Sequence, residues 1–234
     1  MQCFCDLHMH SCLSPCGDEL MTPNNIVKMA ALKGLHMIAL CDHNTARHVP
    51  AVAKIAADYD LAVLPGIELT TREEVHLLAY FRTVEELIAF SDKIYSYLPN
   101  IPNRPDYFGA QQILDENDEP IGEEPKLLIT ALDLSLDELV EMIRARGGIA
   151  VPAHINRSGN GILSVLGFLP PNLGFKVIEV SHGVTCPPGY EGHGRLVSSD
   201  AHYIMDMLER VEALELSAPT PDAFFDWVQQ HYDS

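Results

Sequence analysis

The chain of 234 residues is 47% hydrophobic and 21% charged, which predicts an ordered globular protein whose length suits one large domain. Its formal net charge is -18, and this acidity argues against long nucleic acid as a partner, because phosphate contacts need clustered Lys and Arg. No apolar run approaches the roughly 18 residues that span a bilayer, so we expect no membrane association.

The first predicted strand begins near residue 3 and leads directly into two histidines. Residues i and i+2 of a strand point to the same side, so His8 and His10 direct both imidazoles to one place while Met9 faces away. Neutral imidazole is the commonest metal ligand in proteins. Alone, the pair is equally well read as two surface histidines. Together with the histidines further along the chain, it predicts half of a metal site.

Strands and helices then alternate along the chain, which indicates parallel strands joined by right-handed crossovers. Helix starts are marked by N-cap residues and by proline at the first position, and helix ends by glycine. The predicted strands begin near residues 3, 36, 61, 75, 149, 176 and 195. The predicted helices cover residues 22–34, 51–59, 83–98, 135–148 and 220 onward.

Residues 99–130 differ in character from the rest of the chain. Prolines in this stretch forbid a long helix, and residues 115–118 have the composition of a turn between two short extended pieces. About 30 residues cannot bury a core of their own, so we interpret the stretch as an insertion in a single domain spanning residues 1–234. A lid and a dimer contact are alternatives to plain surface elaboration, which is the default.

Metal-competent side chains lie at or just past the carboxyl ends of most predicted strands, and one lies inside its strand. In a barrel of parallel strands, these ends form the face on which chemistry gathers. A single histidine there is usually packed or exposed without a function, but six of the eleven histidines, with two carboxylates, argue against coincidence. The candidate ligands are His8, His10, His43, Glu68, His76, His154, Asp200 and His202, with Asp18 as a ninth from the loop after the first strand.

The ligand types narrow the choice of metal. Imidazole and carboxylate without obligatory thiolate suit zinc, iron or manganese rather than a Cys-based structural zinc site. Eight or nine ligands are more than one tetrahedral ion uses, which predicts two or three ions with a bridging carboxylate.

The six cysteines are expected to be reduced and mostly packed. The chain begins without a charged-then-apolar signal segment, so we expect a cytoplasmic protein. Cys12 and Cys16 lie near the predicted site, and an accessory ligand role is kept open for them.

Five motifs resemble, in the same order, the successive motifs of the PHP (polymerase and histidinol phosphatase) superfamily. They are Asp6-Leu7-His8-Met9-His10-Ser11, Cys41-Asp42-His43-Asn44, Pro65-Gly66-Ile67-Glu68, Pro152-Ala153-His154 and Ser199-Asp200-Ala201-His202. The resemblance covers nearly the whole chain, although each motif alone is weak. It implies a distorted (β/α)7 TIM-like barrel with a trinuclear metal centre that hydrolyses phosphoesters, and the seven predicted strands agree with that fold.

The resemblance also implies how the ligands divide among the ions. His8, His10, Glu68 and Asp200 would surround one ion, and Glu68 would bridge to a second ion held by His76 and His154. A third ion would take Asp18, His43 and His202. The loop before Asp18, residues 12–17, is longer than the usual Ser-x-x-Ser-Asp-Gly form of the family, so this position departs from the pattern.

Metal-assisted hydrolysis is the chemistry that these residue types favour. Arg157, three residues after His154, is the leading candidate for contact with the substrate phosphate and is one of three catalytic candidates. The other two are Asp200 and His202, which could protonate the leaving oxygen. Asn44 and His182 are candidate substrate contacts. The other basic residues near strand ends are Arg47, Arg72 and Lys176.

The resemblance is closer to stand-alone phosphoesterases than to histidinol phosphatases, so we expect a small phosphorylated substrate, preferably a nucleotide-type phosphomonoester. Histidinol phosphate is the alternative substrate. A nuclease acting on long DNA is less favoured, because the chain lacks a basic groove. A non-catalytic metal-binding regulatory module is the alternative of another class, although every ligand position is filled. An amidohydrolase is disfavoured by the absence of a candidate carboxylated lysine at a strand end. The oligomeric state is not predicted.

Overall fold

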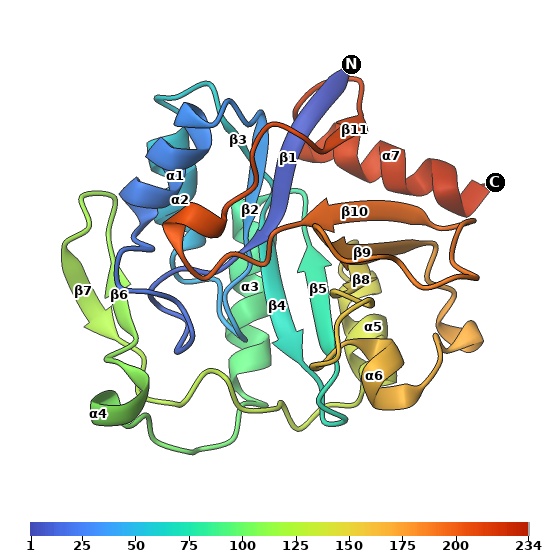
Figure 1. The fold of residues 1–234 in the computed structure, drawn as a ribbon. Helices are drawn as coiled ribbons and strands as arrows, with labels where there is room; N and C mark the ends of the chain where they lie inside the picture. The colour runs from blue at the N-terminus through green and yellow to red at the C-terminus, as the bar shows by residue number, and fades with distance from the viewer. Residues whose placement is uncertain (234) are drawn as a thin grey trace.

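The computed structural model describes residues 1–233, with strands at the centre of the molecule and helices around them (Figure 1). The strands are β1 (Gln2–Met9), β2 (Met37–Leu40), β3 (Ala62–Val63), β4 (Gly66–Thr70), β5 (His76–Tyr80), β6 (Gln112–Leu114), β7 (Pro120–Glu123), β8 (Ile149–Pro152), β9 (Val177–Ser181), β10 (Gly194–Ser198) and β11 (Ala213–Glu215). The helices are α1 (Pro23–Leu32), α2 (Val49–Ala56), α3 (Val84–Tyr95), α4 (Pro105–Phe108), α5 (Leu136–Arg144), α6 (Ile162–Leu166) and α7 (Pro221–Asp233), with 3-10 turns η1 (Pro171–Leu173) and η2 (Ile204–Asp206). The predicted α/β class is confirmed.

Four of the predicted helices, α1, α3, α5 and α7, begin directly after the predicted capping residues Thr22, Thr83, Ser135 and Thr220. Thr22 accepts a hydrogen bond from the backbone N–H of Asn25 at the start of α1. The starts of α3 and α5 carry capping boxes, which are Thr83 with Glu86 and Ser135 with Glu138. No helix within residues 1–233 combines the length and the apolar character that crossing a membrane requires.

The prediction of uniformly parallel strands is wrong at β5. This strand pairs antiparallel with both β4 and β8, whereas β1, β2 and β3 pair in parallel, as do β9 and β10. Residues 71–75 alone connect β4 to β5, which is too short for a crossover and forces a hairpin. As a result, His76 at the start of β5 lies opposite Thr70 at the end of β4. A histidine that begins its strand thereby reaches the rim formed by the carboxyl ends of other strands.

The strands do not form one continuously hydrogen-bonded barrel among the residues that the structure describes. They make sheets ordered β11-β1-β2-β3, β4-β5-β8 and β9-β10, with β6-β7 as a separate hairpin. Isolated parallel bridges join the sheets, at Met9 with Ala201 and at His43 with Glu68. The predicted (β/α)7 barrel is therefore not shown as a closed structure, and the connections between its sheets lie next to the predicted ligands.

The two ends of the strand assembly differ in polarity. Cys3, Met37 and Val177, at the amino ends of parallel strands, pack with Phe224 and Val228 of α7 in one buried apolar cluster. Helix α7 thus covers this end of the molecule (Figure 1). The opposite ends of the strands carry buried histidines and carboxylates instead.

Residues 99–130 contain the β6–β7 hairpin, and the predicted turn joins its strands, with the N–H of Asp118 donating to the carbonyl of Asp115 at 3.1 Å. The carboxylate of Asp118 accepts hydrogen bonds from Thr22 and Asn24 at the start of α1. The N–H of Leu114 donates to Nε2 of His48 at 2.8 Å. The hairpin is therefore held against the starts of α1 and α2.

Candidate metal centre

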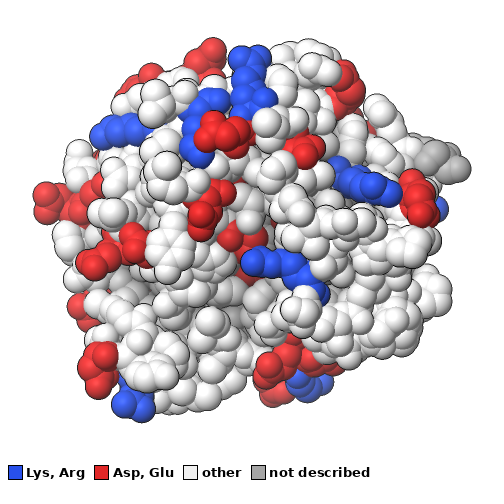
Figure 2. Space-filling view, viewed as in Figure 1, with Lys and Arg blue, Asp and Glu red and all other residues white. Residues whose placement is uncertain are grey.

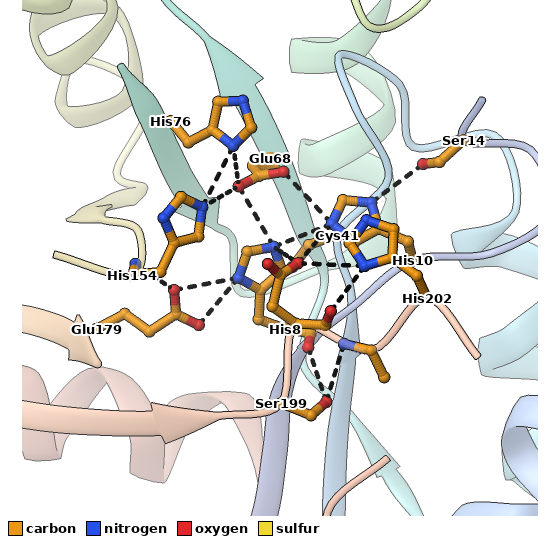
Figure 3. A network of polar contacts seen from close by, with 12 residues as sticks. His8, His10, Ser14, Cys41, Glu68, His76, His154, Glu179, Ser199 and His202 are labelled. Carbon is orange, nitrogen blue, oxygen red and sulfur yellow. Dashed lines mark hydrogen bonds and ion pairs between the residues drawn. The ribbon is translucent and has the colours of Figure 1, made fainter. Parts of the chain in front are cut away.

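Eight of the nine predicted ligands converge at the rim where β1, β2 and β4 end and β5 begins. Figure 3 shows His8, His10, Glu68, His76, His154 and His202 among them. Glu68 of β4 is at the centre of this group and is fully buried. Its carboxylate oxygens lie 2.8 Å from Nδ1 of His76 and 3.0 Å from Nδ1 of His43. The other rings within 3.4 Å of this carboxylate are those of His8, His10 and His154.

The backbone departs from regular geometry where several of these side chains emerge. The pairing of β1 with β2 shifts register between Asp6 and Met9, and such bulges redirect side chains. His154 and Asp200 have φ angles of 28° and 54°, in a region that non-glycine residues rarely adopt. Each such residue costs on the order of 1–3 kcal/mol, and strain of this kind clusters at functional sites.

If His8 and His10 are both neutral, as metal ligands must be, their hydrogen bonds leave two lone pairs facing each other. Nδ1 of His8 donates to Glu179 at 2.9 Å, so its Nε2 carries no proton in the neutral ring. Ser14 gives its single hydroxyl proton to Asp42 and therefore accepts from Nδ1 of His10 at 3.1 Å. The two bare Nε2 atoms lie 3.2 Å apart. A cation between them relieves this repulsion.

Further buried donor atoms are oriented toward the same place without hydrogen-bond partners. They are Nδ1 of His43, Oε2 of Glu68 and Oδ1 of Asp200. Burial lowers the pKa of His43 to about 4 despite the neighbouring Glu68 carboxylate, so this ring is neutral near pH 7 and keeps its lone pair. Buried polar atoms are normally paired, and unpaired groups call for an explanation such as an ion.

The donor atoms group by distance into sets that fit divalent metal ions, because imidazole and carboxylate are ligands of zinc, iron and manganese. Within each set the donor atoms lie within 4.8 Å of one another. The sets found among the described residues are His8 with His10 and Asp200, His43 with Glu68 and His76, and His10 with Cys16, His43 and His202.

Without an ion, the carboxylates hold protons on the histidines. Burial opposes the charged form of His10, but the adjacent carboxylates of Asp200 and Glu68, 3.1 and 3.4 Å from its Nε2, outweigh it and raise the pKa of His10 to about 9. Burial likewise opposes ionisation of Asp200, but the charges of His8 and His10 hold the pKa of this carboxyl below its usual range. The proton on His10 thus occupies the place of positive charge that a metal ion would fill.

Metal affinity is therefore expected to rise with pH up to about pH 9. His10, with a pKa of about 9, and His8, whose pKa is raised well above its usual value, bind protons that an incoming ion must displace. Each displaced proton changes the affinity about tenfold per pH unit below its pKa. Competition titrations of zinc against a chelating dye at pH 6, 7 and 8 measure this slope. Affinity that does not change with pH would contradict it.

Carboxylates behind the ligands fix their orientation, and the sequence analysis gave the most important of them no role. Glu179 of β9 accepts from Nδ1 of His8 and, at 2.7 Å, from the backbone N–H of His154. Asp42 accepts from both Ser11 and Ser14. Such partners of metal ligands set the ring orientation and the basicity of the ligand. The sequence does contain a sign of this role, because Glu179 is an acidic residue within the apolar run of residues 177–180.

Three predicted site residues are placed elsewhere. Oδ1 of Asp18 accepts from the N–H of Leu20, and Asp18 is in none of the clusters of described residues. The amide of Asn44 donates to the carbonyls at residues 128 and 130, so this side chain fastens that segment to the end of β2. His182 is exposed and lies 3.3 Å from Glu212. Where these three side chains lie depends on the conformation of the loops that carry them, which residue type alone does not reveal.

A cavity of about 620 Å³ opens directly onto the ligands. Arg157 lines it and contacts Oδ2 of Asp200, while Oδ1 of Asp200 faces His8 and His10. Basic and acidic side chains are interspersed over the face of the molecule seen in Figure 2. The remaining lining residues are His43, Glu68, His76, His154, Asn156, Ser158, Gly159, Asn160, Val184 and His202.

Comparison with known proteins gives a family match and two curated relatives. The sequence model of the PHP domain matches residues 6–146. An uncharacterised protein of Methanocaldococcus jannaschii is 34% identical over 76 residues, which are 29% of this chain and 44% of the relative. A 5'-3' exoribonuclease of Haemophilus influenzae is 25% identical over 192 residues, covering 64% of this chain and 68% of the enzyme.

Solved structures share the fold at low sequence identity. Endonuclease Q of Pyrococcus furiosus, a lesion-specific endonuclease, superposes with a TM-score of 0.70 and 19% identity over 98% of this chain. This chain spans only 56% of that protein. A putative metal-dependent phosphoesterase of Bifidobacterium adolescentis superposes with a TM-score of 0.60 and 18% identity, covering 97% of this chain and 96% of the phosphoesterase.

The prediction that excluded long nucleic acid is contradicted by these structures. One structure of Endonuclease Q contains a 27-mer duplex with an abasic lesion at the active site. Net charge was a poor guide because bound metal ions and a few local cations, rather than the sum over the chain, set the field that a phosphate meets.

Proposed function

This chain belongs to the PHP domain family, and on that premise we propose that it is a metal-dependent phosphoesterase acting on nucleotide-type phosphate esters. The observation that carries the proposal is the convergence of bare imidazole and carboxylate donor atoms beside an open cavity. When bound there, divalent ions would lower the pKa of a water molecule and polarise phosphoryl oxygens. The cavity volume is in the range that accommodates a nucleotide-sized ligand.

The residues around the cavity divide the remaining tasks. Arg157 presents its guanidinium to the cavity and matches a phosphate group in geometry and charge. Asp200 uses one oxygen toward the histidines and the other toward Arg157, which positions that guanidinium. Burial and the neighbouring His10 lower the pKa of His202, so its ring is neutral near pH 7. Since Nδ1 of His202 donates to the carbonyl of Asp200, its Nε2 is the nitrogen that can ligate a metal ion.

A substrate panel tests the proposal. Metal-free protein is reconstituted with zinc, manganese or iron and assayed with nucleoside monophosphates, nucleoside bisphosphates, histidinol phosphate and p-nitrophenyl phosphate. Release of inorganic phosphate that requires metal, with nucleotides turned over fastest, is the expected result. Preference for histidinol phosphate would replace the substrate assignment. Protein that binds metal ions but hydrolyses no ester in the panel would indicate a non-catalytic metal-binding module.

A second candidate is cleavage of phosphodiesters in nucleic acid. The openness of the site toward solvent at Arg157, whose side chain is 45% exposed, favours it, since a chain can pass where a closed pocket would admit only a monomer. The similarity to a 5'-3' exoribonuclease supports it as well. Adding 5'-phosphorylated single-stranded RNA, single-stranded DNA and a duplex with an abasic site to the panel distinguishes the two, because mononucleotide or shortened-strand products are resolved by electrophoresis.

Replacing Arg157 by alanine is expected to raise the KM for phosphate substrates about tenfold. A hydrogen bond to a charged group contributes roughly 1.5–3 kcal/mol, and every 1.4 kcal/mol is tenfold in binding. Steady-state kinetics on the preferred ester give KM and kcat. Arg47→Ala is the matched control, because Arg47 is exposed and pairs with Asp92. Equal KM values for the two variants would remove Arg157 from the substrate site.

A further inference from the structure

We propose that Cys16, as a thiolate, ligates the metal ion held by His43 and His202, in the place that Asp18 was expected to fill. The inference rests on the proposed function in that it requires the site to bind metal ions, and it extends that function by assigning one position to a soft metal. Thiolate ligands select zinc over harder ions such as manganese and magnesium.

The sulfur of Cys16 lies near the imidazoles of three candidate ligands, and Cys16 is not part of the hydrophobic core. The donor atoms of Cys16, His10, His43 and His202 lie within 4.8 Å of one another. Tetrahedral zinc with Zn–S and Zn–N distances of about 2.3 and 2.0 Å places sulfur and nitrogen ligands roughly 3.5 Å apart. Cys16 belongs to neither of the buried apolar clusters, in contrast to Cys3, Cys5 and Cys41.

The sharing of ligands leaves Cys16 in a set of three. Nε2 of His10 also faces His8 and Asp200, which form a cluster with it. With His10 assigned to that cluster, the neighbouring ion is left with Cys16, His202 and His43, of which His43 is also near Glu68 and His76. Three protein ligands with one open position are the arrangement of catalytic rather than structural zinc sites. The buried Nδ1 atom of His43 lies 3.0 Å from Oε2 of Glu68 but makes no hydrogen bond, which is a separate sign that this ring is incomplete without an ion.

The loop backbone holds Cys16 in this position. A Cβ atom on Gly17 would lie 2.0 Å from the carbonyl oxygen of Ser11, so the close approach there admits only glycine. The N–H of Gly17 donates to the carbonyl of Ser14 at 2.9 Å, and the N–H of Asp18 donates to the carbonyl of His202 at 2.9 Å. The two residues that follow Cys16 are thus anchored, and the second is held by the backbone of His202, a fellow ligand.

The same loop turns the carboxylate of Asp18 away from the histidines. Its Oδ1 accepts from the N–H of Leu20 at 2.9 Å, in the turn that leads toward α1. The extra residue in this loop relative to Ser-x-x-Ser-Asp-Gly brings Cys16, the residue directly before Gly17, to the position of the aspartate in that form. The substitution exchanges an oxygen ligand for sulfur at one ion and leaves the oxygen and nitrogen ligands of the others unchanged.

Cobalt substitution tests the proposal, because thiolate bound to Co²⁺ gives an intense charge-transfer absorption in the near ultraviolet that oxygen and nitrogen ligands do not give. Metal-free full-length protein is titrated with Co²⁺, and bound zinc is counted by atomic emission. The wild type, Cys12→Ser and Asp18→Asn are expected to show the band, and Cys16→Ser to lose it together with about one equivalent of zinc. Cys12→Ser is the matched control, since Cys12 is in the same loop but outside the clusters of described residues.

Cys16→Asp guards against a variant that fails to fold. It is expected to bind cobalt without the charge-transfer band and to regain the metal equivalent through oxygen. Persistence of the band in Cys16→Ser, or its loss in Asp18→Asn, would overturn the assignment. The charge-transfer band is measured on protein without substrate, so it does not depend on hydrolysis. If the wild type shows the band but hydrolyses no ester, the proposed function is refuted and the ligand assignment is not. Hydrolysis by a wild type without the band refutes this inference alone.

Discussion

Replacing Glu68 by glutamine is expected to lower turnover about 10³-fold and to reduce the metal content of the purified protein. The carboxylate is fully buried, and its oxygens lie within 3.4 Å of imidazole nitrogens from five histidines of the described chain. Metal ions held by such a carboxylate supply several kcal/mol of transition-state stabilisation. Loss of about 4 kcal/mol corresponds to about 10³-fold in rate.

Glutamine is the informative replacement because it keeps the shape of the side chain and removes only its charge. The rate on the preferred ester, metal content by atomic emission and thermal unfolding are measured together. Glu141→Gln is the matched control, since Glu141 is exposed on α5 and belongs to none of the ligand clusters among the described residues. A Glu68→Gln protein that retains its metal and its rate would show that the carboxylate does not bridge ions.

The grouping of the candidate ligands could be predicted from sequence because each of them is marked by a short local pattern. A histidine or carboxylate that closely follows an apolar run, as His43 and Asp200 do, can be recognised as a candidate ligand without knowing how the strands pair. The fold then brings the ends of parallel strands to one rim, so local signals add up to a common site. His76 was included although β5 was assigned the wrong direction. Its hairpin carries the start of β5 to the rim that the end of a parallel strand would have reached.

What could not be predicted depended on loop conformation and on contacts between distant segments. Whether Cys16 or Asp18 faces the histidines is decided by the tight turn at Gly17, which no periodicity reveals. The role of Asn44 depends on carbonyls in the insertion, at residues 128 and 130. Closure of the barrel likewise depends on hydrogen bonds between sheets, which strand counting does not address.

Glu179→Gln is expected to weaken metal binding and turnover by about 10–100-fold, the usual cost of losing an outer partner of a metal ligand. The carboxylate of Glu179 accepts two hydrogen bonds, from Nδ1–H of His8 at 2.9 Å and from the backbone N–H of His154 at 2.7 Å. A carboxylate offers an acceptor to each. A carboxamide offers one acceptor and one donor, so one of the two hydrogen bonds is replaced by a donor–donor contact. His8 then loses the bond that keeps its Nε2 bare, or the strand end before His154 shifts.

The matched control for Glu179→Gln is Glu212→Gln, because Glu212 also pairs with a histidine, His182, but on the exposed surface. Zinc dissociation constants at pH 6 and pH 8 separate a positioning role from simple destabilisation. The Glu179 charge helps to raise the pKa of His8 against the effect of burial, so removing it also weakens proton competition at that ring. The loss of affinity is therefore expected to be smaller at pH 6 than at pH 8. An equal loss at both pH values, accompanied by a lower unfolding temperature, would show that Glu179 stabilises the fold without orienting His8.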